Sequence, residues 1–304
     1  MRVSTPMITG HLAERIAANA ERLFRLQQQV SSGKRMLAPS DDPTAAARAV
    51  EMRSSLTQIA QYADNVERAT QKLKTVDVLL GDLGNAIRSA RDIALQAANG
   101  AMSADSQAAL ARDLDDLIRR IMETGNAESN GYHVFAGYKT LTVPFATNPS
   151  GTPPVIYSGD EGQQSVEVGR DASIVVNVPG SVVFNMGGTA NPALDDLFTT
   201  LTELRDQILA GDAAAISQQI TDIDAHLQRV LVFRADVGGK VSQLDLCATR
   251  LQGMHLTVTD ALSKTEDVDL SQVVVDLQTQ ENIYQATAAV AAQVSRLSLV
   301  DYLL

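Results

Sequence analysis

The sequence holds one cysteine and no tryptophan, and only 4% of its 304 residues are aromatic. One cysteine, Cys247, excludes an internal disulfide. Its surroundings, LDLCATRL, are typical of a helix core, so we expect a buried, unreactive thiol. No apolar run approaches the roughly 20 residues of a membrane span, and the start MRVSTPMITG lacks the apolar segment of a signal peptide. We therefore expect no membrane insertion, and export without a cleaved signal peptide if the protein leaves the cell.

Basic and metal-binding residues are also few. The chain has 25 Lys and Arg against 36 Asp and Glu, a net charge of −11, whereas nucleic-acid-binding proteins usually carry a basic face. The histidines, His11, His133, His226 and His255, have no ligand spacing. There is no H-E-x-x-H, phosphate loop, G-x-S-x-G or Cys/His nucleophile pair. We expect no nucleic-acid partner, no catalytic residue, no metal site and no cofactor, so the protein is predicted not to be an enzyme.

Glycine and proline are scarce over most of the chain and concentrated in one part of it. Neither occurs in residues 11–32, 44–80, 212–237 or 254–304. Such stretches, rich in Ala, Leu and Gln, predict long helices. Nine of the 19 Gly and six of the nine Pro lie between Gly131 and Pro192. The runs YHVFAGY, PVIYS, SVEV, SIVVNV and SVVFNM in that part predict short strands between turns.

Apolar residues in the predicted helices recur at coiled-coil spacing. The N-terminal series has Asn19 at one step, and a second series runs on from Met52. A helix from Thr44 to Asn99 is predicted, with Gly81 and Gly84 as candidate bends or interruptions. The predicted fold is mainly α, an elongated bundle of long coiled-coil helices with a small inserted β-rich domain. We predict three parts: terminal axial segments 1–39 with 265–304, a long-helix rod 40–131 with 193–264, and a β-rich insertion 132–192.

The two ends of the chain differ in charge. Residues 1–40 carry six Lys and Arg and two Glu, a net of +4, and residues 265–304 carry one Arg and six Asp and Glu, a net of −5. Opposite charge on two amphipathic helices favours pairing, although unrelated solvated faces are the alternative. The C-terminal apolar face is wider than one partner covers, which predicts self-assembly. The expected assembly interface is Leu12, Ile16, Leu23, Leu26, Val30, Val274, Leu277, Tyr284, Ala291, Val294 and Leu297.

The stretch SSGKRMLAPSDDPTAAARA combines helix-ending and helix-starting residues. Gly33 is placed to end the first helix, and Pro39 discourages an early restart. Asp41 or Asp42 can cap the next helix, and Pro43 fits its first position. With no histidine or third acid nearby, acid–base or metal chemistry is a minor alternative. We predict a joint between a terminal helix and a long helix.

The joint sequence resembles the N-terminal signature of the flagellin family, and LQTQENIYQATAAVAAQVSRLSLVDYLL is similar to the family's C-terminal end. The start MRVST, the form SDDP and the segment NGYHVFAGYKT are more similar to the junction proteins of the family than to bulk flagellin. The resemblance covers both helical thirds well and the β insertion weakly. It implies a structural, non-enzymatic protein of the bacterial flagellum, exported by the flagellar type III apparatus.

The resemblance also implies partners. A junction protein of this family would self-associate into an adaptor ring outside the cell, with hook-associated protein 1 on the hook side and flagellin on the filament side. An exposed apolar C-terminal helix in the isolated chain implies an export chaperone bound there, because lone helices gain little order in water. Alternatives are a short flagellin that forms the filament itself, or a secreted coiled-coil effector or enzyme on a helical scaffold.

Overall fold

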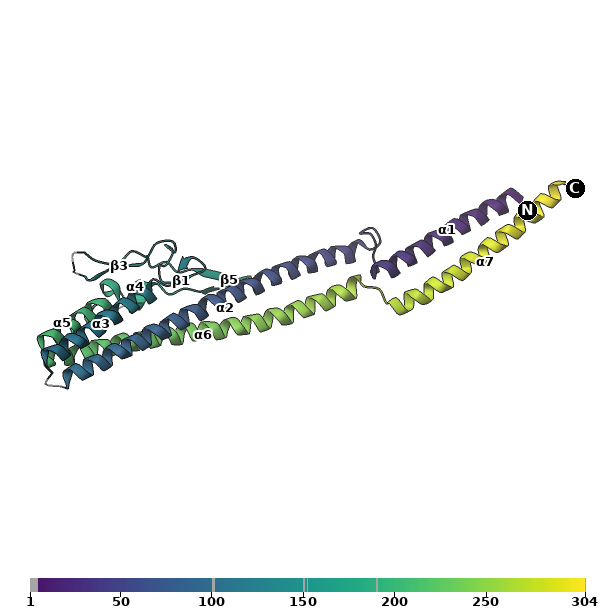
Figure 1. Ribbon diagram of the computed structural model, residues 1–304. Coiled ribbons are helices and arrows are strands. Elements are labelled where there is room, and N and C mark those ends of the chain that lie inside the picture. The colour runs from purple at the N-terminus through teal and green to yellow at the C-terminus, as the bar shows by residue number, and fades with distance from the viewer. Residues whose placement is uncertain (1–4, 100–101, 150, 152, 190, 304) are drawn as a thin grey trace. The chain divides into compact units, whose positions relative to one another are not determined.

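In the computed structural model the chain is mainly helical (Figure 1). The structure describes residues 5–99, 102–149, 151, 153–189 and 191–303, and only the backbone of 5–9 and 294–303. The packing divides the chain into two compact units, Met1–Gln58 with Met254–Leu304, and Ile59–Gly253. In the described part of the chain, no helix is both long and apolar enough to cross a membrane.

The helices confirm the mainly α prediction. They are α1 (Thr5–Ser32), α2 (Pro43–Ala98), α3 (Ala104–Gly125), α4 (Gly180–Val183), a 3-10 turn η1 (Met186–Gly188), α5 (Leu197–Ala210), α6 (Ala213–Glu266) and α7 (Leu270–Leu303). The predicted interruption of α2 is wrong, because the helix runs without a break through Gly81 and Gly84. There is room for a Cβ at both positions, where the nearest side chains belong to Arg234 and Val230 of α6.

The core of the unit Ile59–Gly253 lies along α2 and α6. Side chains buried from α6 recur every seven residues, which keeps one stripe of this long helix against its neighbours. They are Ile216, Ile223, Val230, Val237, Leu244 and Leu251. Ion pairs join the same two helices, with Arg234 Nε 3.0 Å from Asp77 Oδ1 and Arg91 Nε 2.6 Å from Asp224 Oδ1.

The shorter helices complete this core. Ser103 caps α3 through its hydroxyl oxygen, which accepts from Ser106 N, and the Asp196 carboxylate caps α5 in the same way from Thr199 N. Gly211 ends α5 with φ of 70°, a left-handed conformation that suits glycine. The inner face of α3 is buried, and its members include Leu110, Leu114, Leu117 and Ile121.

The inserted β region consists of three separate antiparallel hairpins. They are β1 (Glu128–Ser129) with β2 (Tyr132–His133), β3 (Phe145–Thr147) with β4 (Val155–Tyr157), and β5 (Ser165–Gly169) with β6 (Ala172–Val175). The region begins earlier than predicted, at Glu128, and β3 lies in a segment that is not among the predicted strand runs. PVIYS, SVEV and the first part of SIVVNV are confirmed as strand-forming runs.

The prediction that SVVFNM forms a strand is wrong. Its first residues form α4, because Pro179 precedes the turn and its carbonyl oxygen accepts from Val182 N and Val183 N. A helical turn lets Val183 and Phe184, which are neighbours in sequence, both be buried. An alternating strand would have turned one of them outward.

An aromatic cluster ties the hairpins to the helices of the same unit. The Phe145 ring lies 4.6 Å from Phe184 and 5.7 Å from Phe198 of α5, centroid to centroid. Gly125 and Gly180 leave space for these rings, because a Cβ at either position would lie 2.8 Å from Phe145. The β insertion is therefore packed into the helical core. Cys247 of α6 is half-buried, so the expectation of a buried cysteine is wrong. The reason is that α6 is packed on one side only at this point.

Candidate assembly surfaces

The terminal helices α1 and α7 lie side by side in the first unit (Figure 1). The predicted α1 series is half-buried throughout, and it consists of Leu12, Ile16, Leu23, Leu26 and Val30. From α7, Leu277, Tyr284 and Ala291 are half-buried, whereas Val274 is 39% exposed. The side chains of Val294 and Leu297 lie outside the described residues. The structure therefore brings most of the predicted interface together within one chain.

A polar contact interrupts this apolar seam. Asn19 Nδ2 donates to Thr287 Oγ1 at 3.2 Å. Gln280, whose exposure is 9%, donates through Nε2 to both the Asn19 carbonyl and Asn19 Oδ1 at 3.3 Å. A single polar pair in an apolar seam is satisfied in only one register of the two helices. The series in the sequence marked Asn19 as a break, but no pattern there identified Gln280 and Thr287 as its partners.

Apolar side chains of α7 also lie outside the seam with α1. Large hydrophobic side chains are between 39% and 57% exposed there, and they are Leu270, Val274, Val275, Ile283 and Val290. On α1, Phe24 is 58% exposed. These side chains stay in water although α1 is paired with α7, and grouped exposed apolar side chains are typical of a surface that another molecule covers.

The helix joint uses the predicted residues in distinct ways. Gly33 ends α1 with φ of +67°, and its N–H donates to Gln29 O at 2.9 Å. Asp42 Oδ1 accepts from Ala45 N at 3.0 Å and so caps α2, in which Pro43 is the first residue. Asp41 does not cap α2. Its Oδ2 accepts from the backbone N–H groups of Leu37 and Ala38 at 3.0 Å and so holds the turn that contains Pro39.

A second chain segment closes the joint, and sequence reasoning missed it. Lys34 pairs with Asp267 in an isolated antiparallel bridge, and Lys34 Nζ lies 2.6 Å from Asp267 Oδ1. Arg35 N donates to Glu266 O at 2.7 Å, and Val268 N donates to Gly33 O at 3.1 Å. We call the residues 33–35 and 266–268 the clasp. The opposite charges of the chain ends were the only sequence signal that pointed to it.

Glu266 is the buried anion of the clasp, with an exposure of 5%. Its Oε2 lies 2.8 Å from Arg53 Nη2 and 3.3 Å from Lys34 Nζ, so two cations share one carboxylate. A buried charge needs such partners, and removing one of them leaves the carboxylate poorly compensated. The clasp thereby fixes where α1 ends and α7 begins.

Hydrogen bonds shift the pKa values at the joint. The hydrogen bond to the Asp267 carboxylate contributes most to raising the pKa of Lys34 above its usual value. Lys34 in turn lowers the pKa of Asp267. The N–H groups of Ala38 and Leu37 lower the pKa of Asp41. All three shifts favour the charged forms, so the joint is held by ionised groups at neutral pH.

These surfaces are suited to binding between helices. Within the described residues, no group of three or more His, Cys, Asp or Glu side chains is placed to hold a metal ion. The arrangement can bury apolar surface and match charges.

Three comparisons with known proteins agree with the sequence resemblance. The model for the bacterial flagellin N-terminal helical region matches residues 3–140. Flagellar hook-associated protein 3 of Salmonella typhimurium is 30% identical to this chain, with 98% of each protein covered. Among solved structures, a putative flagellar hook-associated protein from Vibrio parahaemolyticus has a TM-score of 0.67 and 21% identity, and covers 75% of this chain and 100% of its own. A flagellar junction protein from Legionella pneumophila has a TM-score of 0.60 and 18% identity, covering 73% and 100%.

Proposed function

Because the chain belongs to the family of flagellar hook-associated protein 3, we propose that it is a structural subunit of the junction between the hook and the filament of the bacterial flagellum. The similarity over nearly the whole of both chains carries this proposal. The protein is not an enzyme. The packed helices, the clasp and the exposed apolar side of α7 suit a subunit whose work is to bind neighbouring subunits.

Self-association is proposed to proceed through the terminal segments 1–39 and 265–304. The seam between α1 and α7 uses one side of each helix, while Val275, Ile283 and Val290 remain exposed. Copies arranged in a ring would cover these side chains with helices from their neighbours. The residues 40–131 with 193–264 are proposed as the rod, and residues 132–192 as the β-rich insertion on it.

The individual binding partners and the export route follow from the same proposal. The ring would contact hook-associated protein 1 on the hook side and flagellin on the filament side. Export through the flagellar type III apparatus would place the protein outside the cell without cleavage of a signal peptide. A chaperone on the C-terminal helix would cover the apolar side of α7 before export, because an exposed surface of this kind promotes aggregation.

The test is where the protein sits on the organelle. Full-length protein with a small epitope tag in the β3–β4 turn would be expressed in its own bacterium, and sheared flagella would be labelled with antibody-coated gold. We expect one band of label at the hook–filament boundary and few copies per flagellum. Label along the whole filament, with the tagged chain as its major protein, would support the short flagellin instead and overturn the proposal.

A further inference from the structure

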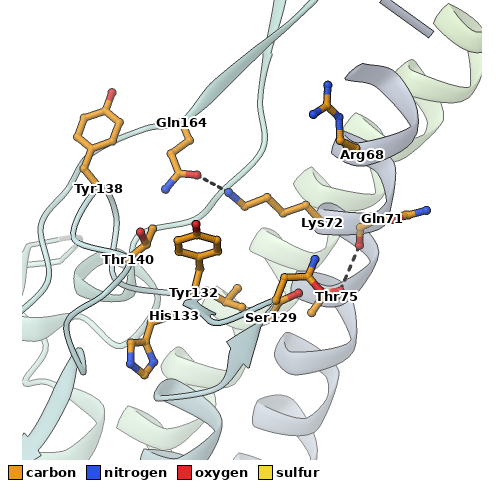
Figure 2. Close-up of a pocket in the computed structure, with 12 residues that line it drawn as sticks. Arg68, Gln71, Lys72, Thr75, Ser129, Tyr132, His133, Tyr138, Thr140 and Gln164 are labelled. Atoms are coloured by element: carbon orange, nitrogen blue, oxygen red, sulfur yellow. Dashed lines mark hydrogen bonds between the residues drawn. The ribbon is translucent and has the colours of Figure 1, made fainter. Parts of the chain in front are cut away.

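A pocket of about 710 Å³ lies between α2 and the β insertion, inside the unit Ile59–Gly253 (Figure 2). Its size is in the range of sites for small molecules. It is lined by Arg68, Gln71, Lys72, Thr75, Ser129, Asn130, Tyr132, His133, Val134, Tyr138, Thr140 and Gln164. The lining contains no carboxylate, although the chain as a whole carries a net charge of −11.

Lys72 is one of the cations that line this pocket, together with Arg68. It is half-buried and donates to Gln164 Oε1, and no carboxylate among the described residues forms an ion pair with it. Burial lowers the pKa of Lys72. Gln164 is held in turn, because its Nε2 donates to Gly137 O at 2.6 Å. The ammonium is therefore positioned by one fixed neutral oxygen, and its other two N–H donors are available to a ligand.

The neighbouring charged groups are occupied elsewhere. Arg68 Nη2 lies 3.1 Å from Asp64 Oδ2 and also donates to Asn65 Oδ1 at 2.8 Å. His133 points away from Lys72 (Figure 2), and its Nδ1 lies 2.9 Å from Asn126 O. One unpaired positive charge matches a singly charged carboxylate better than a phosphate dianion, which usually takes several cations or backbone N–H groups.

The rest of the lining suits a ring that carries hydroxyl groups. Tyr132 is 54% exposed, and Figure 2 shows its hydroxyl pointing towards the Lys72–Gln164 pair. Ser129 and Thr140 bring hydroxyl groups to the lining, and Figure 2 shows Thr140 beside that ring, while Gln164 brings the amide. Flat aromatic faces combined with hydroxyl and amide groups can contact both the apolar face and the hydroxyl groups of a sugar.

We propose that this pocket binds an acidic sugar of the uronic-acid type, with its carboxylate on Lys72 and its ring against Tyr132. This goes beyond the role at the junction, since no part of the terminal helices or the clasp contributes to the pocket. The sugar is either a free monosaccharide or the end of a polysaccharide, because both present the same carboxylate and ring.

Saturation-transfer NMR on the full chain tests the proposal with galacturonate as the probe. We expect saturable binding, weakened on the order of tenfold or more with galactose, which lacks the charge, and with acetate, which lacks the ring. Lys72→Met should weaken the binding of galacturonate to the same extent. Lys74 is an exposed lysine on the same helix, and Lys74→Met should leave this binding unchanged. Tyr132→Ser, at a position that is 54% exposed in the folded chain, should also weaken binding.

Trigalacturonate separates the two sources. If trigalacturonate binds much more tightly than galacturonate, the natural ligand is the end of a polysaccharide. If both bind equally, it is a free monosaccharide. Either result supports the proposal. Equal binding of galactose and galacturonate, an equal loss in Lys74→Met, or no saturable binding at all would overturn it. Binding of an acidic peptide such as triglutamate without binding of galacturonate would assign the pocket to a protein partner and would also overturn it.

Discussion

At the residue scale, Asn19 shows how one polar side chain fixes the pairing of α1 with α7. Its bonds to Gln280 and Thr287 exist in one register only. We predict that Asn19→Leu keeps the helices paired but allows shifted registers, because Gln280 and Thr287 lose the side chain whose hydrogen bonds select one register. Spin labels on α1 and α7 should then give a broader distance distribution. Gln28→Leu, at an exposed position of α1, is the control, and an equally narrow distribution in Asn19→Leu would contradict the prediction.

The adjacent aspartates of the joint should respond differently to substitution. Asp42→Ala removes the cap of α2, and we predict a loss of about 1 kcal/mol in the free energy of unfolding. Asp42→Ser should restore most of it, because a serine oxygen can also accept from the helix N–H. Asp41→Ala should loosen the turn at 37–41 and leave the cap intact. Denaturant unfolding compares the three variants, and an unchanged midpoint in Asp42→Ala would exclude the capping role.

The clasp should depend on pH at both ends of the scale. Lys34 has a raised pKa in the folded chain. Its contribution to the stability of the clasp is therefore complete below 10.5, the ordinary value, and is lost as the pH rises through the folded pKa. Asp267 has a lowered pKa, so its contribution to the stability of the clasp is complete above 3.8, the ordinary value, and is lost as the pH falls through the folded value. Asp41 has a lowered pKa too, and it acts in the same direction on the neighbouring turn at 37–41.

We therefore predict a plateau in the stability of the clasp between those limits, with a decrease on either side. Amide exchange of Arg35 and Val268 reports on the clasp directly, since their N–H groups donate across it. Lys34→Met should weaken protection across the plateau and remove the alkaline decrease. An alkaline decrease that persists unchanged in Lys34→Met would assign it to another group.

At the scale of elements, the β insertion and the helices depend on each other. Phe198 of α5 has an exposure of 0% and lies 5.6 Å from Phe184 and 5.7 Å from Phe145, centroid to centroid. We predict that Phe198→Ala costs about 3–5 kcal/mol, because it leaves a cavity between rings that cannot close. Phe24→Ala, at an exposed position of α1, should cost far less. Similar losses in both variants would contradict the account of this core.

Replacing residues 142–186 by a Gly/Ser linker tests the same dependence at a larger scale. The insertion interrupts the helical part of the chain, so we expect it to be dispensable for secretion and for joining the flagellum. We still expect secretion of this variant, but with a lower melting temperature, because the replacement removes Phe145 and Phe184 from the core around Phe198. Accumulation of the variant in the cytoplasm as folded protein would contradict the first expectation.

The elements that sequence reasoning predicted well are those with a long repeat. The boundaries of α2 follow from Pro43 and from the last residues before Gly100. The apolar spacing within the helix predicts which of its residues form the seam. The strand β3 and the turn α4 were mispredicted because their residues are decided by the aromatic cluster, whose members are distant in sequence. The clasp was missed for the same reason, since nothing near Lys34 in the sequence indicates Glu266 or Asp267.

At the scale of the whole molecule, the terminal helices should be the least protected part of an isolated chain. Exposed apolar residues on α7 gain contacts only from neighbouring copies, and a lone pair of helices gains little from propensity in water. We predict fast amide exchange in 1–38 and 267–304, apart from the N–H groups that donate across the clasp, and slow exchange in α2 and α6 between residues 59 and 253. Slow exchange throughout both ends of a verified monomer without chaperone would show that they fold as a closed pair before assembly.

The clasp also bears on the order in which the chain folds. The bond from Lys34 to Asp267 joins residues 233 positions apart, and closing a free loop of that length is entropically costly and slow. Pairing of α2 with α6 inside Ile59–Gly253 removes most of that loop beforehand. Refolding should therefore proceed from the middle of the sequence outward, with the ion pairs around Glu266 formed last. Protease sites in α1 and α7 should be the last to become protected after dilution from denaturant.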